Sequence, residues 1–143
     1  MSTIDILLVE DDPRDLELTL RTLRKHHLAN QIVVARDGAE ALQLLRAEPG
    51  QSLPSPRLVL LDLKLPKVSG LEVLRTLKGN SATSHIPVVI LTSTDDQPEI
   101  DACYRLGANS FVRKPVDFAE FTAAVQQIGL YWLVVNQPPE PKP

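Results

Sequence analysis

Cysteine is nearly absent from this sequence, and its absence limits the chemistry to be expected. The 143 residues include one cysteine, Cys103. A single thiol cannot form an internal disulfide and has no cysteine partner for a zinc site, which fits a reducing compartment. Redox chemistry is therefore not the expected function.

The sequence also lacks an excess of positive charge. It has 15 Lys and Arg residues against 18 Asp and Glu residues, which gives a formal net charge of -3. A nucleic-acid partner would need a surplus of basic side chains to neutralise its phosphates. The composition therefore disfavours a nucleic-acid-binding module.

Long apolar runs are missing as well. The longest ones are interrupted well before the roughly 20 residues that a membrane-spanning helix needs. Residues 1–10 lack the basic region and the cleavage site of a signal peptide. A cytoplasmic protein without a membrane partner is the expectation.

The sequence does contain short apolar runs that alternate with segments of helical spacing. Hydrophobic residues make up 43% of the chain, which suits one core rather than two. This alternation is typical of an α/β fold, in which helices cover a parallel sheet. The expected strands are residues 4–9, 31–35, 58–61, 88–91 and 110–113.

A helix is expected after each strand. Asp12 and Pro13 predict the cap and the first turn of the first helix. The other helices are expected from about residues 38, 70, 98 and 117. Apolar residues at helical spacing predict one buried face on the last helix: Phe118, Phe121, Val125, Ile128 and Trp132. Residues 48–56, rich in Pro, Gly and Ser, are expected to form a surface loop.

Polar side chains follow the predicted strands where parallel strands bring their carboxyl ends to one edge of the sheet. They are Glu10, Asp11, Asp62, Thr92, Ser93 and Lys114. Because clustered carboxylates repel one another, a divalent cation with oxygen ligands, Mg²⁺ above all, would relieve the repulsion. A carboxylate beside a metal, a lysine and a hydroxyl is suited to accept a phosphoryl group, because the cations offset the arriving negative charge.

Four segments, in order, resemble the receiver domain of two-component response regulators. They are Leu7-Leu8-Val9-Glu10-Asp11-Asp12, Leu60-Leu61-Asp62-Leu63-Lys64-Leu65-Pro66 with Gly70, Leu91-Thr92-Ser93, and Lys114-Pro115. The likeness runs from residue 4 to about residue 132. It implies a flavodoxin-like (βα)5 fold with a doubly wound, five-stranded parallel sheet of order 2-1-3-4-5. It further implies a receiver domain over residues 1–133, followed by a proline-rich tail over residues 134–143.

The resemblance also implies roles for individual residues. Asp62 matches the phosphorylated aspartate, Asp11 the acid that binds Mg²⁺ directly, and Glu10 the acid that generally reaches it through water. The main-chain carbonyl of Lys64 matches a further metal ligand. Lys64 and Thr94 occupy variable positions where family members tune the lifetime of the phosphoryl group, so the dephosphorylation rate stays open.

Residues at the ends of the last two strands match the phosphoryl-binding and switch positions of the family. Thr92, with Ser93 beside it, and Lys114 match the groups that bind phosphoryl oxygens. Phe111 matches an aromatic switch position. The peptide bond after Lys114 matches one that is cis in receivers, a form that proline makes less costly.

A narrower resemblance suggests the signalling context. Residues 48–56 and the ending before the proline-rich tail resemble the single-domain regulators paired with bacterial and cyanobacterial phytochromes. The implied partners are a histidine kinase, with phytochromes among the candidates, and an unknown downstream protein. Residues 130–135 are all apolar and cannot all face one sheet. A homodimer is therefore expected through the face of the last strand and helix, with the tail contributing, rather than a tail folded back over its own domain. The expected interface residues are Leu130, Tyr131, Trp132 and Leu133.

Three other functions compete with the signalling receiver. A haloacid dehalogenase-like phosphohydrolase also uses a strand-end aspartate, but its phosphatases need a second acid where Lys64 stands. A flavin-binding protein would need a hydroxyl- and glycine-rich loop after the first strand, where the acids would repel a phosphate. A degenerate receiver would act only as a binding module, and the intact acid, hydroxyl and lysine set argues against it. The expected protein is a receiver that is not an enzyme beyond its own phosphotransfer and autodephosphorylation.

Overall fold

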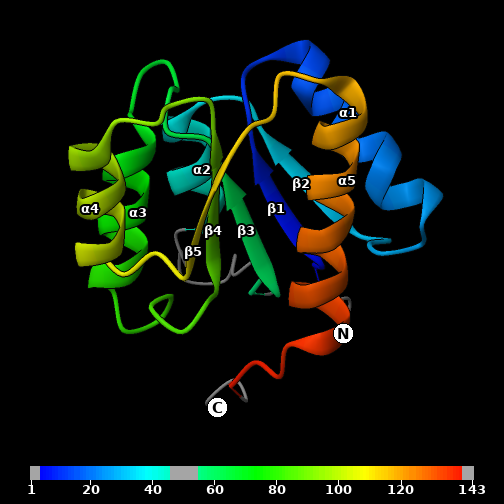
Figure 1. Ribbon diagram of the computed structural model, residues 1–143. Helices are drawn as coiled ribbons and strands as arrows, with labels where there is room; N and C mark the ends of the chain where they lie inside the picture. The colour runs from blue at the N-terminus through cyan, green and yellow to red at the C-terminus, as the bar shows by residue number, and fades with distance from the viewer. Residues whose placement is uncertain (1–3, 46–54, 140–143) are drawn as a thin grey trace.

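The computed structural model describes residues 4–45 and 55–139 of the chain and shows one parallel sheet (Figure 1). Its strand order is β2-β1-β3-β4-β5, which confirms the expected topology. The strands are β1 (Ile6–Val9), β2 (Ile32–Ala35), β3 (Leu58–Leu61), β4 (Val88–Thr92) and β5 (Ser110–Arg113). All residues of β1, β3 and β4 are buried, because helices cover both faces of the sheet.

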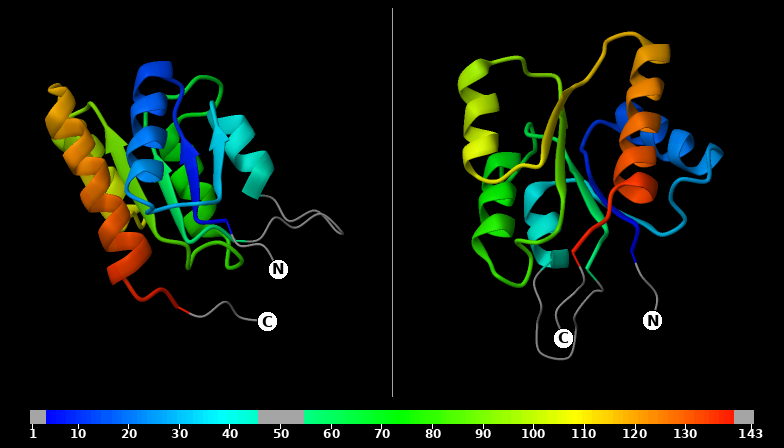
Figure 2. Two further views of the ribbon diagram at one scale, coloured as in Figure 1. Left: turned by 90° about the vertical axis from the view of Figure 1, so that its right-hand side faces the viewer. Right: turned by 60° about the horizontal axis from the view of Figure 1, so that its bottom comes forward.

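The helices form two layers with the sheet between them (Figure 2). They are α1 (Pro13–Lys25), α2 (Gly38–Leu45), α3 (Gly70–Gly79), α4 (Gln97–Arg105) and α5 (Phe118–Gly129). Helices α1 and α5 pack side by side on one face, and α2, α3 and α4 cover the other. Strand side chains alternate between the two cores: Ile6 and Leu8 lie in the core under α1 and α5, and Leu7 and Val9 in the opposite one.

The register of the central strands brings the acidic segments together. Val9 of β1 pairs with Leu61 of β3, so the next residues, Glu10 and Asp62, emerge side by side. The chain leaves β1 toward β2 on one side, whereas β3 lies on the other side of β1. This reversal of strand order opens a crevice at the carboxyl edge of the sheet, the usual ligand position in such folds.

Helix α1 begins where the sequence predicts. The Asp12 carboxylate accepts hydrogen bonds from the backbone N–H groups of Arg14 and Asp15, at 2.9 and 3.2 Å, and Pro13 occupies the first turn. Asp12 is therefore the cap of α1, as expected. This cap fixes how the first turn of α1 lies beyond the end of β1.

The predicted buried face of the last helix is only partly correct. Phe121, Val125 and Ile128 are buried in the core beside α1, but Phe118 is 60% exposed. Phe118 is the first residue of α5, one turn before the core begins, so its ring lies beyond the packed layer. Among the described residues, the helical stretch Phe118–Val135 alone has the length and apolar composition to cross a membrane, and its inner residues pack in the core instead.

A change of helix type determines which residue after Ile128 is the next to be buried in the core. The chain continues from α5 as a π-helix, η1 (Leu130–Val135), in which hydrogen bonds span five residues instead of four. The backbone N–H of Asn136 accordingly donates to the carbonyl of Tyr131 at 2.6 Å. The wider turn places Leu133, only 4% exposed, in the core, while Trp132 is partly buried at its border.

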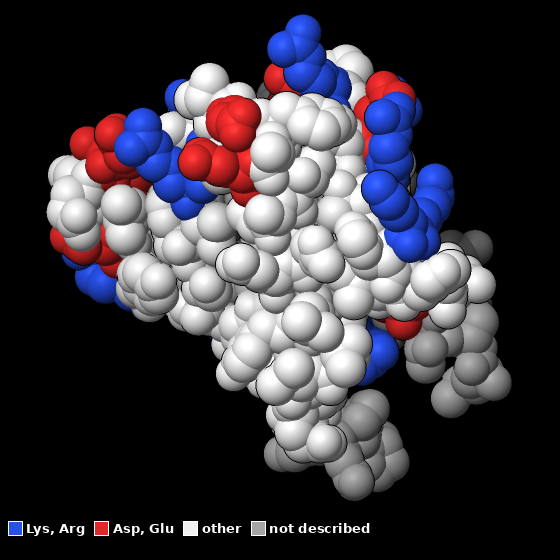
Figure 3. All heavy atoms as spheres, turned by 45° about the vertical axis from the view of Figure 1, so that its right-hand side comes forward, with Lys and Arg blue, Asp and Glu red and all other residues white. Residues whose placement is uncertain are grey.

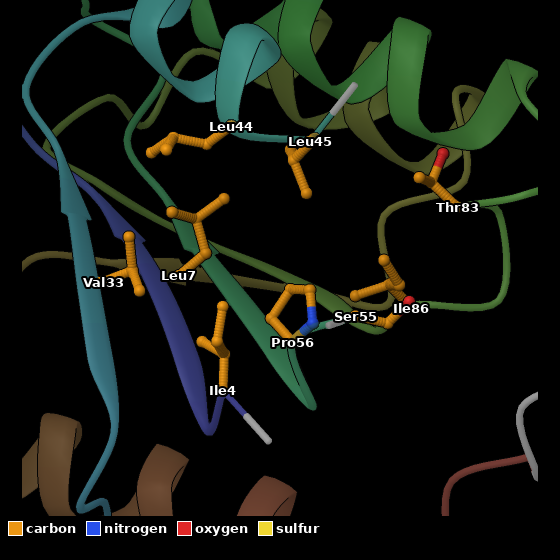
Figure 4. A pocket seen from close by; sticks show the side chains of 9 residues that line it. All are labelled: Ile4, Leu7, Val33, Leu44, Leu45, Ser55, Pro56, Thr83 and Ile86. Carbon is orange, nitrogen blue, oxygen red and sulfur yellow. The ribbon is translucent and has the colours of Figure 1, made fainter. Parts of the chain in front are cut away.

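The described residues at the opposite edge of the sheet line a small cavity. It has a volume of about 40 Å³, enough for a few water molecules, and Leu44, Leu45, Ile4 and Pro56 are among the residues that line it (Figure 4). Nearly all of the loop predicted at residues 48–56 falls outside the described residues, so this prediction stays untested. The functional residues lie at the other edge.

A substitution at Gly70, the first residue of α3, would test how closely this helix packs against the backbone of the loop after β3. A Cβ atom there would clash with the backbone oxygen of Asp62 and lie 2.6 Å from Cα of Leu63. We expect Gly70→Ala to lower the free energy of unfolding by about 1–3 kcal/mol, as overpacking does. Denaturant unfolding measures the change.

Gly79→Ala is the matched control, because a Cβ at this position in α3 meets nothing within 4 Å. Alanine is favoured over glycine in a helix, so this variant should be as stable as the wild type or slightly more stable. Equal unfolding free energies for the two variants would contradict the close packing at Gly70.

Candidate functional site

The Asp62 carboxylate lies at the centre of the carboxyl edge and has donors on both oxygens. Its Oδ1 accepts hydrogen bonds from the Thr92 hydroxyl at 2.7 Å and from the backbone N–H of Lys64 at 3.1 Å. Its Oδ2 accepts one from Nζ of Lys114 at 2.8 Å. Asp62 is only 6% exposed, so these contacts are shielded from water. The structure thus brings together three of the groups predicted from the strand ends.

Lys114 joins several carboxylates at the end of β5. Its Nζ lies 2.6 Å from Oε1 of Glu10, 2.8 Å from Oδ2 of Asp62 and 2.9 Å from Oδ2 of Asp15. The lysine backbone N–H donates to the carbonyl of Thr92 at 2.7 Å, which fixes where its side chain begins. The ammonium therefore compensates negative charge from β1, β3 and α1 at once.

Sequence reasoning missed Asp15. An acid in the first turn of a helix is explained by the helix dipole alone, so the sequence offered no signal for a second role. The contact joins residues 99 positions apart, and only the docking of α1 beside the sheet edge creates it.

The charges of this buried cluster shift the pKa values of its members. Burial, strengthened by the hydrogen bond with Asp62, raises the pKa of Glu10 to about 8, although Lys114 opposes the rise. Burial would also raise the pKa of Asp62, but hydrogen bonds from Glu10, Lys114 and Thr92 hold it below its usual value. Asp62 is consequently the acid of this pair that ionises more readily.

Lys114 stays protonated in this setting. Burial alone would lower the pKa of its ammonium, but the hydrogen bonds to Asp62, Glu10 and Asp15 raise that pKa above its ordinary value. A lysine held in this way is a fixed positive charge beside the Asp62 carboxylate.

Three carboxylates at this edge suit a divalent cation. One oxygen each from Glu10, Asp11 and Asp62 lies within 4.8 Å of the others. Such hard oxygen ligands are typical of Mg²⁺, and the exposed Asp11 leaves an open side where the ion would keep waters. The clustering of three carboxylate oxygens at one sheet edge therefore fits a hard divalent cation.

Two predicted site residues are not among the described hydrogen-bond donors to Asp62. Ser93 is exposed, and it is not among the described donors to the Asp62 carboxylate, which are Thr92, Lys64 and Lys114. Phe111 of β5 is partly buried and packs against the core on the side of α4. The role of Phe111 at a switch would therefore pass through packing rather than through direct contact with the carboxylate.

Two expectations about the neighbouring loops are corrected or refined. The peptide bond after Lys114 is trans, as are all described peptide bonds, and trans is the form that most X–Pro bonds adopt. The Thr94 hydroxyl donates to Oε2 of Glu99 in α4 at 2.7 Å. Thr94 thus ties the loop after β4 to the first turn of α4.

A groove of about 580 Å³ adjoins the site between α1 and α5. Asp15, Ser93 and Lys114 line its inner end, and the exposed Val116 and Phe118 line its outer part. The groove leaves the side of the site that faces α1 open to solvent.

The model of the response regulator receiver domain matches residues 6–126 of this sequence. The chain belongs to the response regulator receiver family. Receivers take a phosphoryl group from histidine kinases and bind a divalent cation at an acidic site, and the Glu10, Asp11 and Asp62 cluster is such a site. Its signalling function is that of a two-component phosphorelay, so the hydrolase alternative is not favoured.

Relatives of known structure include receivers associated with phytochromes. Response regulator Rcp1 of Synechocystis is 36% identical over 129 residues, which are 90% of this chain and 88% of Rcp1. The structure of its Mn²⁺-bound form has a TM-score of 0.88 at 34% identity, covering 96% of this chain and 99% of that one. The phosphorylated cyanobacterial phytochrome response regulator RcpA also has a TM-score of 0.88, at 31% identity, with coverage of 97% and 100%.

A bacteriophytochrome response regulator is more similar in sequence. AtBRR is 52% identical with a TM-score of 0.70, and the match covers 96% of this receiver and 100% of AtBRR. Structural similarity therefore extends over nearly the whole chain, including residues beyond the family model.

Metal binding should depend on Asp11 more than on its neighbour Asp12. Asp11→Ala removes a carboxylate from the acidic cluster and should weaken Mg²⁺ binding strongly, because hard cations prefer charged oxygen ligands. Titration with Mg²⁺ followed by calorimetry measures the effect.

Asp12→Ala provides the comparison, since Asp12 caps α1. It should reduce stability by about 1 kcal/mol through loss of the cap and leave the metal affinity nearly unchanged. The opposite pattern, with Asp12 needed for the metal and Asp11 dispensable, would show that the ligands are assigned one residue out of register.

Proposed function

We propose that this receiver accepts a phosphoryl group from a histidine kinase on Asp62, with Mg²⁺ bound by the adjoining acids. The observation that carries the proposal is the Asp62 carboxylate itself, which is buried, kept ionised and held between Thr92 and Lys114. An ionised carboxylate is a competent nucleophile, and its position is set by groups that bind anionic oxygens.

The chemistry follows from these contacts. A carboxylate oxygen of Asp62 forms a bond to phosphorus while the bond from phosphorus to the donor histidine nitrogen breaks, and the nitrogen takes the electron pair. Lys114 and the Thr92 hydroxyl, which already contact the two oxygens of Asp62, would donate to the oxygens of the transferred group. Mg²⁺, ligated by Glu10, Asp11, Asp62 and the carbonyl of Lys64, would add positive charge that offsets the phosphoryl oxygens.

The receiver is a switch rather than a metabolic enzyme in this proposal. Its own catalysis is limited to accepting the phosphoryl group and losing it to water. The exposed Lys64 and the partly buried Thr94 lie two residues beyond Asp62 and Thr92, where they would govern how water approaches the phosphoryl group. Ser93, at the inner end of the groove, is assigned a lesser part in binding phosphoryl oxygens.

The intact mass of the protein tests the phosphoacceptor. Acetyl phosphate with Mg²⁺ should add one phosphoryl group to the wild type, and Asp62→Asn should take up none at that position. Labelling of the variant equal to that of the wild type would overturn the assignment of Asp62.

The phosphorylation signal would travel through Thr92 and β5 to Phe111. Thr92 is already hydrogen-bonded to Asp62, and the backbone of Lys114 is tied to Thr92, so displacement at Asp62 moves the ends of β4 and β5 together. Phe111 pairs with Ile90 across these strands and packs toward α4. Phosphorylation would thus bias the packing of Phe111 and with it the surface of α4, β5 and α5.

NMR spectra with and without beryllofluoride, a mimic of the phosphoryl group, measure this coupling. In the presence of Mg²⁺, signals of α4 and β5 should shift in the wild type and not in Asp62→Asn. If the chemical shifts near Asp62 changed while those around Phe111 did not, the proposed transmission of the signal through β5 would be excluded.

The similarity to Rcp1, RcpA and AtBRR supports a phytochrome-type histidine kinase as the phosphodonor. A cytoplasmic location is part of the same proposal. Residues 1–133 would form the receiver and residues 134–143 a proline-rich tail, with η1 crossing the boundary after Leu133 and ending at Val135. The downstream partner is a protein that distinguishes the two packing states of the surface around Phe111.

The C-terminal helix also supports a homodimer. Leu130, Tyr131, Val134 and Val135 are 49–63% exposed and form an apolar patch on η1. Figure 3 shows that the surface around α5 and η1 carries few charged side chains. Leu133, expected at the interface, is buried in its own core instead, and the carbonyl of Leu133 accepts a hydrogen bond from Arg57 at 2.6 Å. The proposed interface therefore consists of Leu130, Tyr131 and the outer edge of Trp132, together with Val134.

Light scattering at micromolar concentration tests the dimer. Tyr131→Glu with Val134→Glu places charges on the exposed side of η1 and should convert a dimer to a monomer, because the carboxylates would be desolvated at the interface. The control is Tyr104→Glu, at a tyrosine of α4 that is equally exposed, 51% against 50%. A wild type that is monomeric with and without beryllofluoride would rule the dimer out.

A further inference from the structure

Asp15 belongs to the site although it lies at no strand end. It is in the first turn of α1, and its Oδ2 is 2.9 Å from Nζ of Lys114. The side chains of the two residues are 23% and 9% exposed. Helix α1 therefore supplies a third carboxylate to a lysine whose other acidic partners follow β1 and β3.

The ammonium of Lys114 has as many N–H groups as it has acidic partners. A protonated lysine carries three donors. Glu10, Asp62 and Asp15 each place one oxygen within 2.6–2.9 Å of Nζ. A phosphoryl group on Asp62 would bring new anionic oxygens to the same ammonium, so one of the present contacts must lengthen or break.

The contact with Asp15 is the one that can be released most readily. Glu10 is buried at 3% exposure, and Asp62 is the acceptor itself. Asp15 is more exposed and borders the groove between α1 and α5, where water can solvate its carboxylate. A buried carboxylate that lost its only counter-charge would instead keep a large desolvation penalty.

We infer that Asp15 is a positioning residue that competes with the phosphoryl group for Lys114 and so weakens the phosphorylated state. The inference rests on the proposed function, because it concerns phosphorylation at Asp62. In the unphosphorylated protein, Asp15 holds the ammonium at the α1 side of the site. On phosphorylation, the ammonium turns to the phosphoryl oxygens and the Asp15 carboxylate is left facing the groove.

Calorimetric titration with beryllofluoride in the presence of Mg²⁺ tests the inference. Asp15→Asn keeps the size of the side chain and removes its charge. It should bind beryllofluoride about fivefold more tightly than the wild type, since a charge-assisted hydrogen bond is roughly twice as strong as a neutral one. Asp15→Ser, which is too short to reach Nζ, should show the same tightening and serves if the asparagine variant fails to fold.

Asp12→Asn is the matched control for the loss of one negative charge. Asp12 lies three residues before Asp15, asparagine retains its capping role, and its carboxylate bonds to backbone N–H groups of α1 rather than to Lys114. Its affinity for beryllofluoride should stay within twofold of the wild type. Asp15→Glu, which keeps the carboxylate, should also stay near the wild type.

A second comparison asks whether Asp15 acts through the lysine. In a Lys114→Gln background, adding Asp15→Asn should no longer tighten the binding of beryllofluoride, whereas a purely structural effect of Asp15 would persist. An Asp15→Asn protein that binds no more tightly than Asp12→Asn would overturn the inference. Failure of the wild type to bind beryllofluoride at all would instead refute the proposed function.

Discussion

The site depends on one buried positive charge. Lys114 is 9% exposed on its side chain and lies within 2.9 Å of carboxylates from β1, β3 and α1. Without it, Glu10 and Asp62 would be two adjacent buried acids, an arrangement that strongly favours protonation of at least one of them. Hydrogen bonds from Glu10, Lys114 and Thr92 hold the pKa of Asp62 below its usual value, whereas burial raises that of Glu10. The same ion cluster thus favours ionisation of Asp62 and places three acids around one position.

The fold makes this cluster possible by gathering short segments at one edge. The pairing of β1 with β3 sets Glu10 beside Asp62, and the pairing of β3 with β4 and of β4 with β5 brings Thr92 and Lys114 to them. Gly70 lets α3 begin close against the backbone of Asp62, so the loop after β3 is held near the carboxylate. The chemistry thus belongs to flexible side chains on a rigid sheet, and a displacement at one strand end is transmitted to its neighbour through the backbone bond between Lys114 and Thr92.

In the C-terminal helix, a local change of backbone geometry alters which side chains are buried and which are exposed. Regular α-helical spacing from Ile128 would turn Trp132 inward, but the π-helix of residues 130–135 puts Leu133 there. The guanidinium of Arg57 then fixes the Leu133 carbonyl to the domain. Helix η1 is consequently anchored on one side and exposes apolar side chains on the other, which supports the proposed interface.

The sequence by itself determined the strands, the cap at Asp12 and the acids, hydroxyl and lysine at the strand ends, because these depend on local patterns of hydrophobicity and on a motif carried by consecutive residues. It could not show that Phe118 is exposed or that Leu133 is buried, since these follow from where the packed layer begins and from the type of the last helical turn. Nor could it show that Asp15 contacts Lys114, a pair 99 positions apart. Contacts of that kind arise only when helices dock on a sheet, and no local pattern records the angle at which they do so.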